Sequence, residues 1–390
     1  MSVGKGRIGR WLGLVVLLCL PLAVGCAGFF PKTTSTSTSS TTNTGDYAYV
    51  ASAYASGSTD VYTLSGYSVG TGTLTKLSGF PLTLSFPPSA LVVNPANTLL
   101  YVGGEGVIYG YSISSAGALT AVTTGGSSAL ATANVVSMDI SPDGGWLFAL
   151  DSDGDTIDEF EIASTGLLTA ATGASYSVTS GTIVPTSIKI SPSTSNAYLA
   201  ISLGTGGDLL YSYSASTGAL TELVQVNVPS TSSSDQAVVF NAAGNTLFIA
   251  RSGTGTGVVP YTIGSGGALT LVTGSPFVAG NGPGSLLIDS TGAYLYAGNK
   301  VDGTISAFSI ASTGVLTALS GSPYASGADV ASLARDNSGD YILSANLGGS
   351  PDVEMYSFDT TTVGKLDSVT TASTGDTEEP AGALAVALTH

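Results

Sequence analysis

The sequence predicts an all-β fold, namely a seven-bladed β-propeller of four-stranded antiparallel blades. The first observation is a motif of glycine, any residue, leucine and usually threonine, which recurs at intervals of 45 to 52 residues. A repeat of this length made of short strands is typical of propeller blades. The second observation is that the repeat region begins with the second strand of a blade and ends with the first strand that this blade lacks. The motif copies begin at Gly72, Gly117, Gly166, Gly218, Gly267, Gly314 and Gly364.

Three further patterns recur in phase with this motif and predict the strands of each blade in order. An apolar strand comes first and ends in a turn rich in Asn, Asp, Pro and Gly, as at residues 138–144. These residue types provide local side-chain caps and positive φ angles in turns. A strand with an aromatic residue follows, as at residues 100–102, and then an alternating strand with one aromatic residue, such as Tyr111. The glycine motif opens the fourth strand. We expect the repeated aromatic rings to pack between blades and not to form a ligand cage.

The ends of the repeat region predict how the ring closes. Residues 47–50 match a second strand, and the missing first strand lies at residues 383–388. We therefore expect the C-terminal strand to join the blade that residues 47–78 begin. This closure would hide the edges that an open sheet exposes.

The sequence before the repeats predicts export and a lipid anchor. Three basic residues precede a short apolar run at residues 11–22, which is typical of a signal peptide. The segment that ends at Cys26 resembles a bacterial lipobox. We expect residues 1–25 to be a lipoprotein signal peptide, residues 26–45 to comprise the lipidated Cys26 and a Ser/Thr-rich tether, and residues 46–390 to be the propeller. An ordinary secretory signal with a chance cysteine is the alternative.

Charge and cysteine content restrict the possible partners. After Cys26 the chain has 26 acidic and seven basic residues, which leaves a net charge of −19. Such a protein should repel nucleic acid. Removal of the signal would leave one cysteine, so no intramolecular disulfide is expected. We predict an exported monomer that a lipid anchors to a membrane. Its expected location is the outer membrane, the periplasm or the cell surface. Its expected partner is an envelope protein, a glycan or a small carbohydrate.

The blade pattern resembles that of the seven-bladed lactonase family, which includes 6-phosphogluconolactonase-like proteins and is similar to surface proteins with Tyr-Val-Thr-Asn repeats. The resemblance is carried by the aromatic strand at residues 100–102, the Ser-Pro-Asp-Gly turn at residues 141–144 and the glycine motif. It covers roughly residues 46–390. These motifs are structural, so they predict the fold and not the chemistry.

Strand order places the candidate binding face. The ends of the second strands share one face of the ring with the loops that enter the next blade, and we expect a ligand there. Polar residues at these positions are the candidates for the binding face. They are Glu105, Asp151, Arg251, Asn299, Asp329, Asn346 and Glu379.

A catalytic function requires groups that this sequence supplies sparingly. The family resemblance implies a central site with His, Arg and carboxylate side chains. Here His390 is the last residue and the only histidine, and Arg251 and Arg335 are the only arginines after Cys26. Lactone hydrolysis needs an activated water and a group that stabilises the oxyanion. Asp235 as base and Arg251 as oxyanion partner are the candidate catalytic residues.

Calcium is the one cofactor that the sequence suggests. Asp151, Asp153 and Asp155 lie at alternate positions of a short hairpin loop, and carboxylate oxygens suit calcium. A polar turn without a metal is the alternative, and we expect no other cofactor.

Taken together, these features favour a surface-anchored propeller that acts as a non-catalytic binding or scaffold module of the cell envelope. The scarcity of histidine and arginine is the main reason. The first alternative is an extracytoplasmic lactonase, a 6-phosphogluconolactonase-like hydrolase that uses carboxylates and Arg251. The second is a structural envelope protein.

Overall fold

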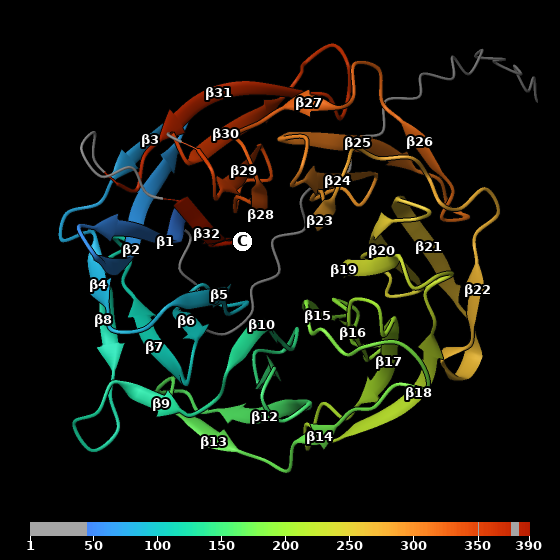
Figure 1. The fold of residues 1–390 in the computed structure, drawn as a ribbon. Coiled ribbons are helices and arrows are strands. Elements are labelled where there is room, and N and C mark those ends of the chain that lie inside the picture. Colours follow the sequence, from blue (N-terminus) through green and yellow to red (C-terminus); the bar gives the residue numbers. More distant parts are fainter. Residues whose placement is uncertain (1–44, 350, 376–381) are drawn as a thin grey trace, which may run out of the picture. The chain divides into compact units, whose positions relative to one another are not determined.

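Seven antiparallel sheets surround a common centre in this computed structural model, which describes residues 45–349, 351–375 and 382–390 (Figure 1). Each sheet has four main strands, and four of the sheets carry a short fifth strand. The predicted fold class, a ring of seven four-stranded blades, is confirmed. In the described part of the chain, no helix is long and apolar enough to cross a membrane.

The strands follow the predicted order from the centre of the ring outward. The innermost strands of blades 1 to 7 are β32 (Gly382–Leu388), β5 (Pro88–Val93), β10 (Val135–Ile140), β15 (Ser187–Ile190), β19 (Ser233–Phe240), β23 (Pro283–Ile288) and β28 (Val330–Arg335). The second strands are β1 (Tyr47–Ser56), β6 (Leu99–Gly104), β11 (Trp146–Asp151), β16 (Tyr198–Ser202), β20 (Thr246–Gly253), β24 (Tyr294–Asn299) and β29 (Tyr341–Asn346). The third strands are β2 (Thr59–Gly70), β7 (Val107–Ile113), β12 (Thr156–Ile162), β17 (Asp208–Tyr213), β21 (Gly257–Ile263), β25 (Thr304–Ile310) and β30 (Val353–Phe358).

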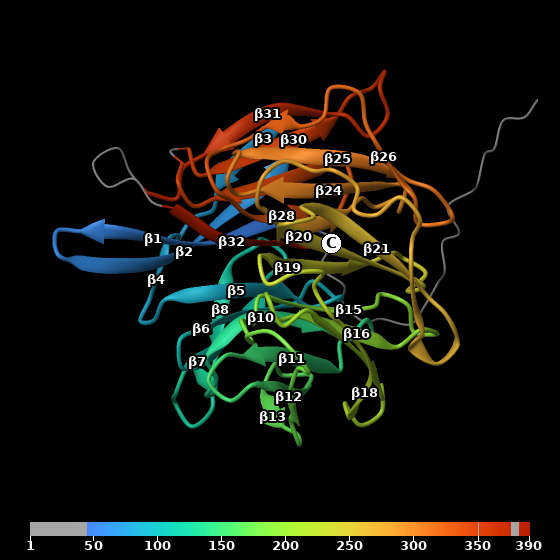
Figure 2. The same cartoon turned by 45° about the vertical axis from the view of Figure 1, so that its right-hand side comes forward.

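The outer edge of each blade is formed by a strand that the glycine motif opens. These strands are β3 (Thr73–Lys76), β8 (Leu119–Val122), β13 (Leu168–Ala170), β18 (Leu220–Val226), β22 (Leu269–Leu271), β26 (Leu316–Ala318) and β31 (Leu366–Ala372). The additional short strands are β4 (Leu82–Leu84), β9 (Ala129–Ala131), β14 (Ala174–Ser175) and β27 (Tyr324–Ala325), and a 3-10 turn, η1, spans Ser265–Gly267. The β1–β2 hairpin is long and projects beyond its neighbours in Figure 2.

The ring closes as the sequence predicts. β32 pairs antiparallel with β1, and Ala48 lies opposite Leu388 in this register. The Thr389 hydroxyl donates to the backbone oxygen of Gly45 at 2.9 Å, which fastens the start of the propeller to its end. Each innermost strand packs against the innermost strands of the two neighbouring blades.

Aromatic residues of the second strands join adjacent blades, which confirms the expected packing role. The hydroxyl of Tyr101 donates to the backbone oxygen of Gly166 at 2.9 Å, and that of Tyr296 donates to Gly364 O at 2.7 Å. Both acceptors are glycines of the repeated motif in the next blade. All seven motif glycines have φ between 68° and 83°, a region that side chains disfavour. The aromatic strand and the glycine motif therefore form one contact that repeats around the ring.

Candidate functional site

The innermost strands enclose a central channel with a volume of about 520 Å³. The residue before the last in each of these strands lines it. These seven residues, here called the ring of seven, are Val92, Asp139, Lys189, Val239, Leu287, Ala334 and Ala387. Two neighbours in this ring are charged and the other five are apolar.

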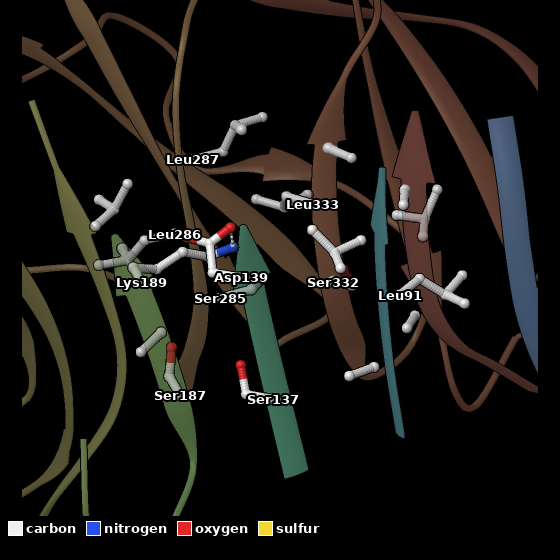
Figure 3. A pocket seen from close by; sticks show the side chains of 18 of the residues that line it. Leu91, Ser137, Asp139, Ser187, Lys189, Ser285, Leu286, Leu287, Ser332 and Leu333 are labelled. Carbon is white, nitrogen blue, oxygen red and sulfur yellow. Dashed lines mark ion pairs between the residues drawn. The ribbon is translucent and has the colours of Figure 1, made fainter. Parts of the chain in front are cut away.

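Asp139 and Lys189 form an ion pair inside the channel, with Nζ of Lys189 3.9 Å from Oδ1 of Asp139 (Figure 3). The carboxylate is held firmly, because its Oδ2 accepts the backbone N–H of Ile190 at 2.8 Å and its Oδ1 that of Ile140 at 3.1 Å. The side chain of Lys189 is 41% exposed to solvent. At this distance the ammonium group can also bind a ligand oxygen.

His390 lies at the mouth of the same channel, at the ends of the innermost strands. Its backbone N–H donates to Oδ1 of Asn97 at 2.9 Å, and Nδ2 of Asn97 donates to its backbone oxygen at 2.8 Å. Its Nδ1 lies 3.2 Å from the backbone oxygen of Leu388. A carbonyl oxygen only accepts, so this contact requires hydrogen on Nδ1 and leaves the Nε2 lone pair available.

The surroundings of His390 favour the neutral form of its imidazole. His390 is exposed to solvent, but the protein atoms around it partly desolvate the ring, and this is the main reason that the pKa of His390 lies below its usual 6.5. The positive charges of Arg335 and Lys189 lower this pKa further, whereas Asp139 and the contact with Leu388 oppose them. Arg335 also lines the channel, and among the described residues it forms no ion pair.

This arrangement combines a neutral imidazole with two cationic side chains. A neutral imidazole with a free lone pair can remove a proton from water. An ammonium or guanidinium group can stabilise a developing oxyanion. The channel is therefore lined by an imidazole that can accept a proton and by two cationic side chains.

The predicted catalytic pair occupies a different place. Arg251 donates two hydrogen bonds to Asp235, Nε to Oδ1 at 2.6 Å and Nη2 to Oδ2 at 2.7 Å. Asp235 is fully buried and Arg251 is 6% exposed, and neither side chain lines the channel. The structure thus brings the two residues together at the seam between blades 4 and 5, outside the channel lining.

A second carboxyl group completes this buried cluster. Asp208 is 1% exposed, and burial and then the adjacent Asp235 carboxylate raise its pKa well above the usual value. One arginine thus faces two carboxyl groups in this cluster. The cluster of Asp208, Asp235 and Arg251 is therefore a buried polar contact between blades, in which Oδ2 of Asp208 has no hydrogen-bond partner among the described residues.

The other predicted binding-face residues divide into buried and accessible ones. Asp151 is 9% exposed, and Asn299 and Asn346 are fully buried. Nδ2 of Asn299 donates to the hydroxyls of Thr304 and Ser306 at 2.9 Å, within its own blade. Glu105 is exposed and Asp329 is half-buried, with φ of 57°. Glu379 lies outside the described residues.

The predicted calcium ligands bind their own loop. Asp151 accepts the backbone N–H of Asn134 at 3.1 Å and that of Asp153 at 2.7 Å, and Asp153 accepts a hydrogen bond from the Asn134 side chain. Asp155 has φ of 48° and is exposed. No group of three or more metal-ligating side chains occurs in the described ranges. Calcium binding stays a prediction, which calorimetry at millimolar calcium would test.

Sequence reasoning missed Asp139, Lys189 and the position of His390. We expected the ligand at the other face of the ring, and His390 was set aside as a terminal residue. A signal was nevertheless available. Asp139 and Lys189 stand one residue before Ile140 and Ile190, at matching positions of two apolar strands where every other copy of the repeat is apolar. The predicted signal peptide, Cys26 and most of the tether lie outside the described residues.

Comparisons with known proteins agree with this fold. The profile of the family described as "Lactonase, 7-bladed beta-propeller" matches residues 127–324 and 246–383. No curated protein sequence matches the chain. A proposed 6-phosphogluconolactonase of Bacteroides fragilis is 18% identical, with a TM-score of 0.67, over 90% of this chain and 99% of its own. The periplasmic gluconolactonase PpgL of Pseudomonas aeruginosa is 18% identical, with a TM-score of 0.63, over 88% of this chain and 98% of its own. At such identities the structures show similarity of fold alone.

Proposed function

Because this chain belongs to the seven-bladed β-propeller lactonase family, we propose that it hydrolyses a lactone in its central channel. The observation that carries the proposal is that His390, Lys189 and Arg335 line one channel, with both cations close enough to influence the imidazole electrostatically. The lowered pKa of His390 increases the fraction of neutral imidazole, the form that can accept a proton.

The chemistry follows from these positions. Nε2 of His390 takes a proton from water while the water oxygen forms a bond to the lactone carbonyl carbon. The negative charge that develops on the carbonyl oxygen is stabilised by Lys189 or Arg335. The ring C–O bond then breaks, and its oxygen receives the proton from Nε2. The product is the open-chain hydroxy acid. Asp139 acts as a positioning residue, since it holds Lys189 at 3.9 Å.

The main prediction from sequence, a non-catalytic binding or scaffold module, rested on the missing internal histidine. His390 is the last residue in sequence, but Asn97 fixes it within the ring. With this group in the channel, the main argument against catalysis no longer holds, and the comparisons lend no support to a scaffold role. For Arg251 and Asp235 we propose a structural role between blades instead of the catalytic role predicted from sequence.

We also propose that the protein works outside the cytoplasm, attached through Cys26. The signal-like sequence supports this location, and the similar fold of a periplasmic gluconolactonase is compatible with it. Metabolic labelling with a fatty acid tests the anchor. Label should enter the native protein and not the Cys26→Ser variant, and equal labelling of both would contradict the anchor.

The activity can be tested on the purified protein by pH-stat titration with glucono-δ-lactone and δ-valerolactone, after subtraction of spontaneous hydrolysis. We expect His390→Gln to lower kcat/KM by about 10² to 10⁴-fold. Lys189→Met should lower it by about 10² to 10³-fold if this lysine is the oxyanion partner. Lys300→Met, at an exposed position after β24, is the matched control and should leave the rate unchanged. No rate above the spontaneous one would refute the proposal.

A further inference from the structure

Arg335 is the channel cation without a partner. It is the last residue of the innermost strand β28 and lines the channel. Within the described ranges, its guanidinium group takes part in no ion pair and in no hydrogen bond. A guanidinium group is always charged and presents its N–H donors in a planar fork. These donors are therefore available to a ligand in the channel.

The carboxylates close to Arg335 in the fold or in the sequence bind other groups. Asp139 faces Lys189, and Figure 3 shows the ammonium group directed at this carboxylate. Asp289 and Asp336 are buried, and each accepts the backbone N–H of the residue five positions later, at 2.9 and 2.8 Å. Lys189 thus shares its charge with a carboxylate, whereas Arg335 does not.

Arg335 lies at the same end of the channel as His390. β28 and β32 belong to neighbouring blades and pack against each other. Arg335 ends β28, and His390 follows β32 by two residues. Of the two channel cations, Arg335 lowers the pKa of His390 more than Lys189 does, which supports Arg335 as the cation nearer to the imidazole.

Hydrolysis of a lactone changes the charge of the bound molecule. The lactone is a neutral ester, and the hydroxy acid that it yields loses a proton to water, because carboxyl groups titrate at about pH 4. The new carboxylate contains the carbon atom that the water attacked, so it forms beside His390.

We infer that Arg335 binds this carboxylate through parallel N–H donors, so that the channel holds the open-chain product more tightly than the lactone. The identity of the anion rests on the proposed function. A contact between a guanidinium group and a carboxylate is charge-assisted and stronger than one to a neutral carbonyl oxygen. The acidic character of the whole protein opposes anion binding at long range, but salt screens charges beyond about 8 Å at physiological ionic strength. The consequence is inhibition of the enzyme by its own product.

Two probes of equal length test the binding on the purified protein. 5-Hydroxypentanoate is the product of δ-valerolactone, and 5-hydroxypentanamide is its uncharged analogue. A ligand-observed NMR titration gives the Kd of each probe without any need for turnover. We expect the carboxylate to bind at least about tenfold more tightly than the amide. It should also inhibit hydrolysis of δ-valerolactone competitively.

Three variants locate the effect. Arg335→Met removes the charge and keeps an apolar stem, and it should lose the preference for the carboxylate. Arg335→Lys keeps the charge without the planar fork and should retain part of this preference. The control is Lys300→Met, which removes one positive charge at an exposed position and should keep the full preference. Melting temperatures show whether each variant is folded.

The outcomes separate this inference from the proposed function. Hydrolysis of δ-valerolactone by a protein that binds the amide as tightly as the carboxylate overturns the inference and leaves lactonase activity intact. A preference that folded Arg335→Met retains also overturns it, because another group would then bind the carboxylate. If no lactone is hydrolysed but the preference exists and depends on Arg335, the proposed function fails while the carboxylate site stands.

Discussion

Asn97 and His390 hold each other through two reciprocal backbone contacts, at 2.9 and 2.8 Å, although 293 residues separate them in the chain. Asn97 belongs to the turn between β5 and β6 in blade 2, and His390 follows β32 of blade 1. The turn residue has φ of 58°, which asparagine tolerates better than most residues. A structural turn thereby fixes the proposed general base.

The first prediction concerns this contact. Asn97→Gly keeps the backbone conformation available and removes both hydrogen bonds. We expect kcat to fall about tenfold or more because His390 is no longer held in place, while KM changes little. Steady-state kinetics on a readily hydrolysed lactone measures both constants. Unchanged kcat in a folded variant would show that the contact does not position the base.

The second prediction is the pH dependence of the rate. Since the base must be neutral and its pKa lies below 6.5, kcat/KM should rise with pH, with its midpoint below 6.5. Lys189→Met removes a positive charge, so in its residual activity the midpoint should move to higher pH. Asp139→Asn removes a negative charge, so the midpoint should move to lower pH. The same midpoint in all three proteins would mean that His390 is not the titrating group.

The third prediction concerns the blade seams. Tyr101→Phe removes the hydrogen bond to Gly166 and leaves the ring in place, so the free energy of unfolding should fall by about 1 kcal/mol. Phe148 already occupies the matching position in blade 3 without a hydroxyl. Chemical denaturation gives the difference. Tyr54→Phe, on the half-buried part of the β1–β2 hairpin, is the control and should change stability by less.

The fourth prediction concerns the closing strand. Leu388 is 3% exposed, and we expect Leu388→Ala to cost about 2–5 kcal/mol through lost contacts and the cavity left behind. Leu271→Ala, at an exposed outer position, should cost far less. Deletion of residues 381–390 should lower the melting temperature of the whole propeller. A truncated protein that melts like the native one would contradict the closure.

The fifth prediction links stability to pH through Glu159. This side chain is 3% exposed, and burial raises its pKa from 4.5 to about 7 although it accepts the backbone N–H of Leu220. Below pH 4.5 the folded and unfolded states both bind the proton. Between pH 4.5 and 7 the folded state binds more protons than the unfolded state, so this group lowers stability progressively as pH rises, with the full loss above 7.

Glu159→Gln removes this dependence because the amide is neutral and can still accept the same bond. The variant should be more stable than the native protein at pH 8, by roughly 1–3 kcal/mol, and equally stable at pH 4. Glu161→Gln, exposed on the same strand, is the control. Denaturation at both pH values provides the test, and an equal change at pH 4 and pH 8 would contradict the assignment.

The sequence by itself determined the number of blades, the strand order and the closure by the C-terminal strand. These features depend on local patterns: the motif glycines adopt positive φ wherever they occur, and apolar alternation defines each strand without reference to distant residues. The sequence also predicted the pairing of β1 with β32. The N-terminal blade lacks its first strand in sequence, and a matching strand occurs at the C-terminal end.

Only the tertiary structure decided which polar residues meet. Asp235 and Arg251 are as polar in sequence as Asp139 and Lys189, yet the first pair is buried at a seam and the second lines the channel. The difference arises because a residue on the innermost strand faces the channel or the adjacent blade according to its register and to how the ring curves. His390 joined the site for the same reason, since closure of the ring carried the end of the chain to the channel mouth beside Asn97.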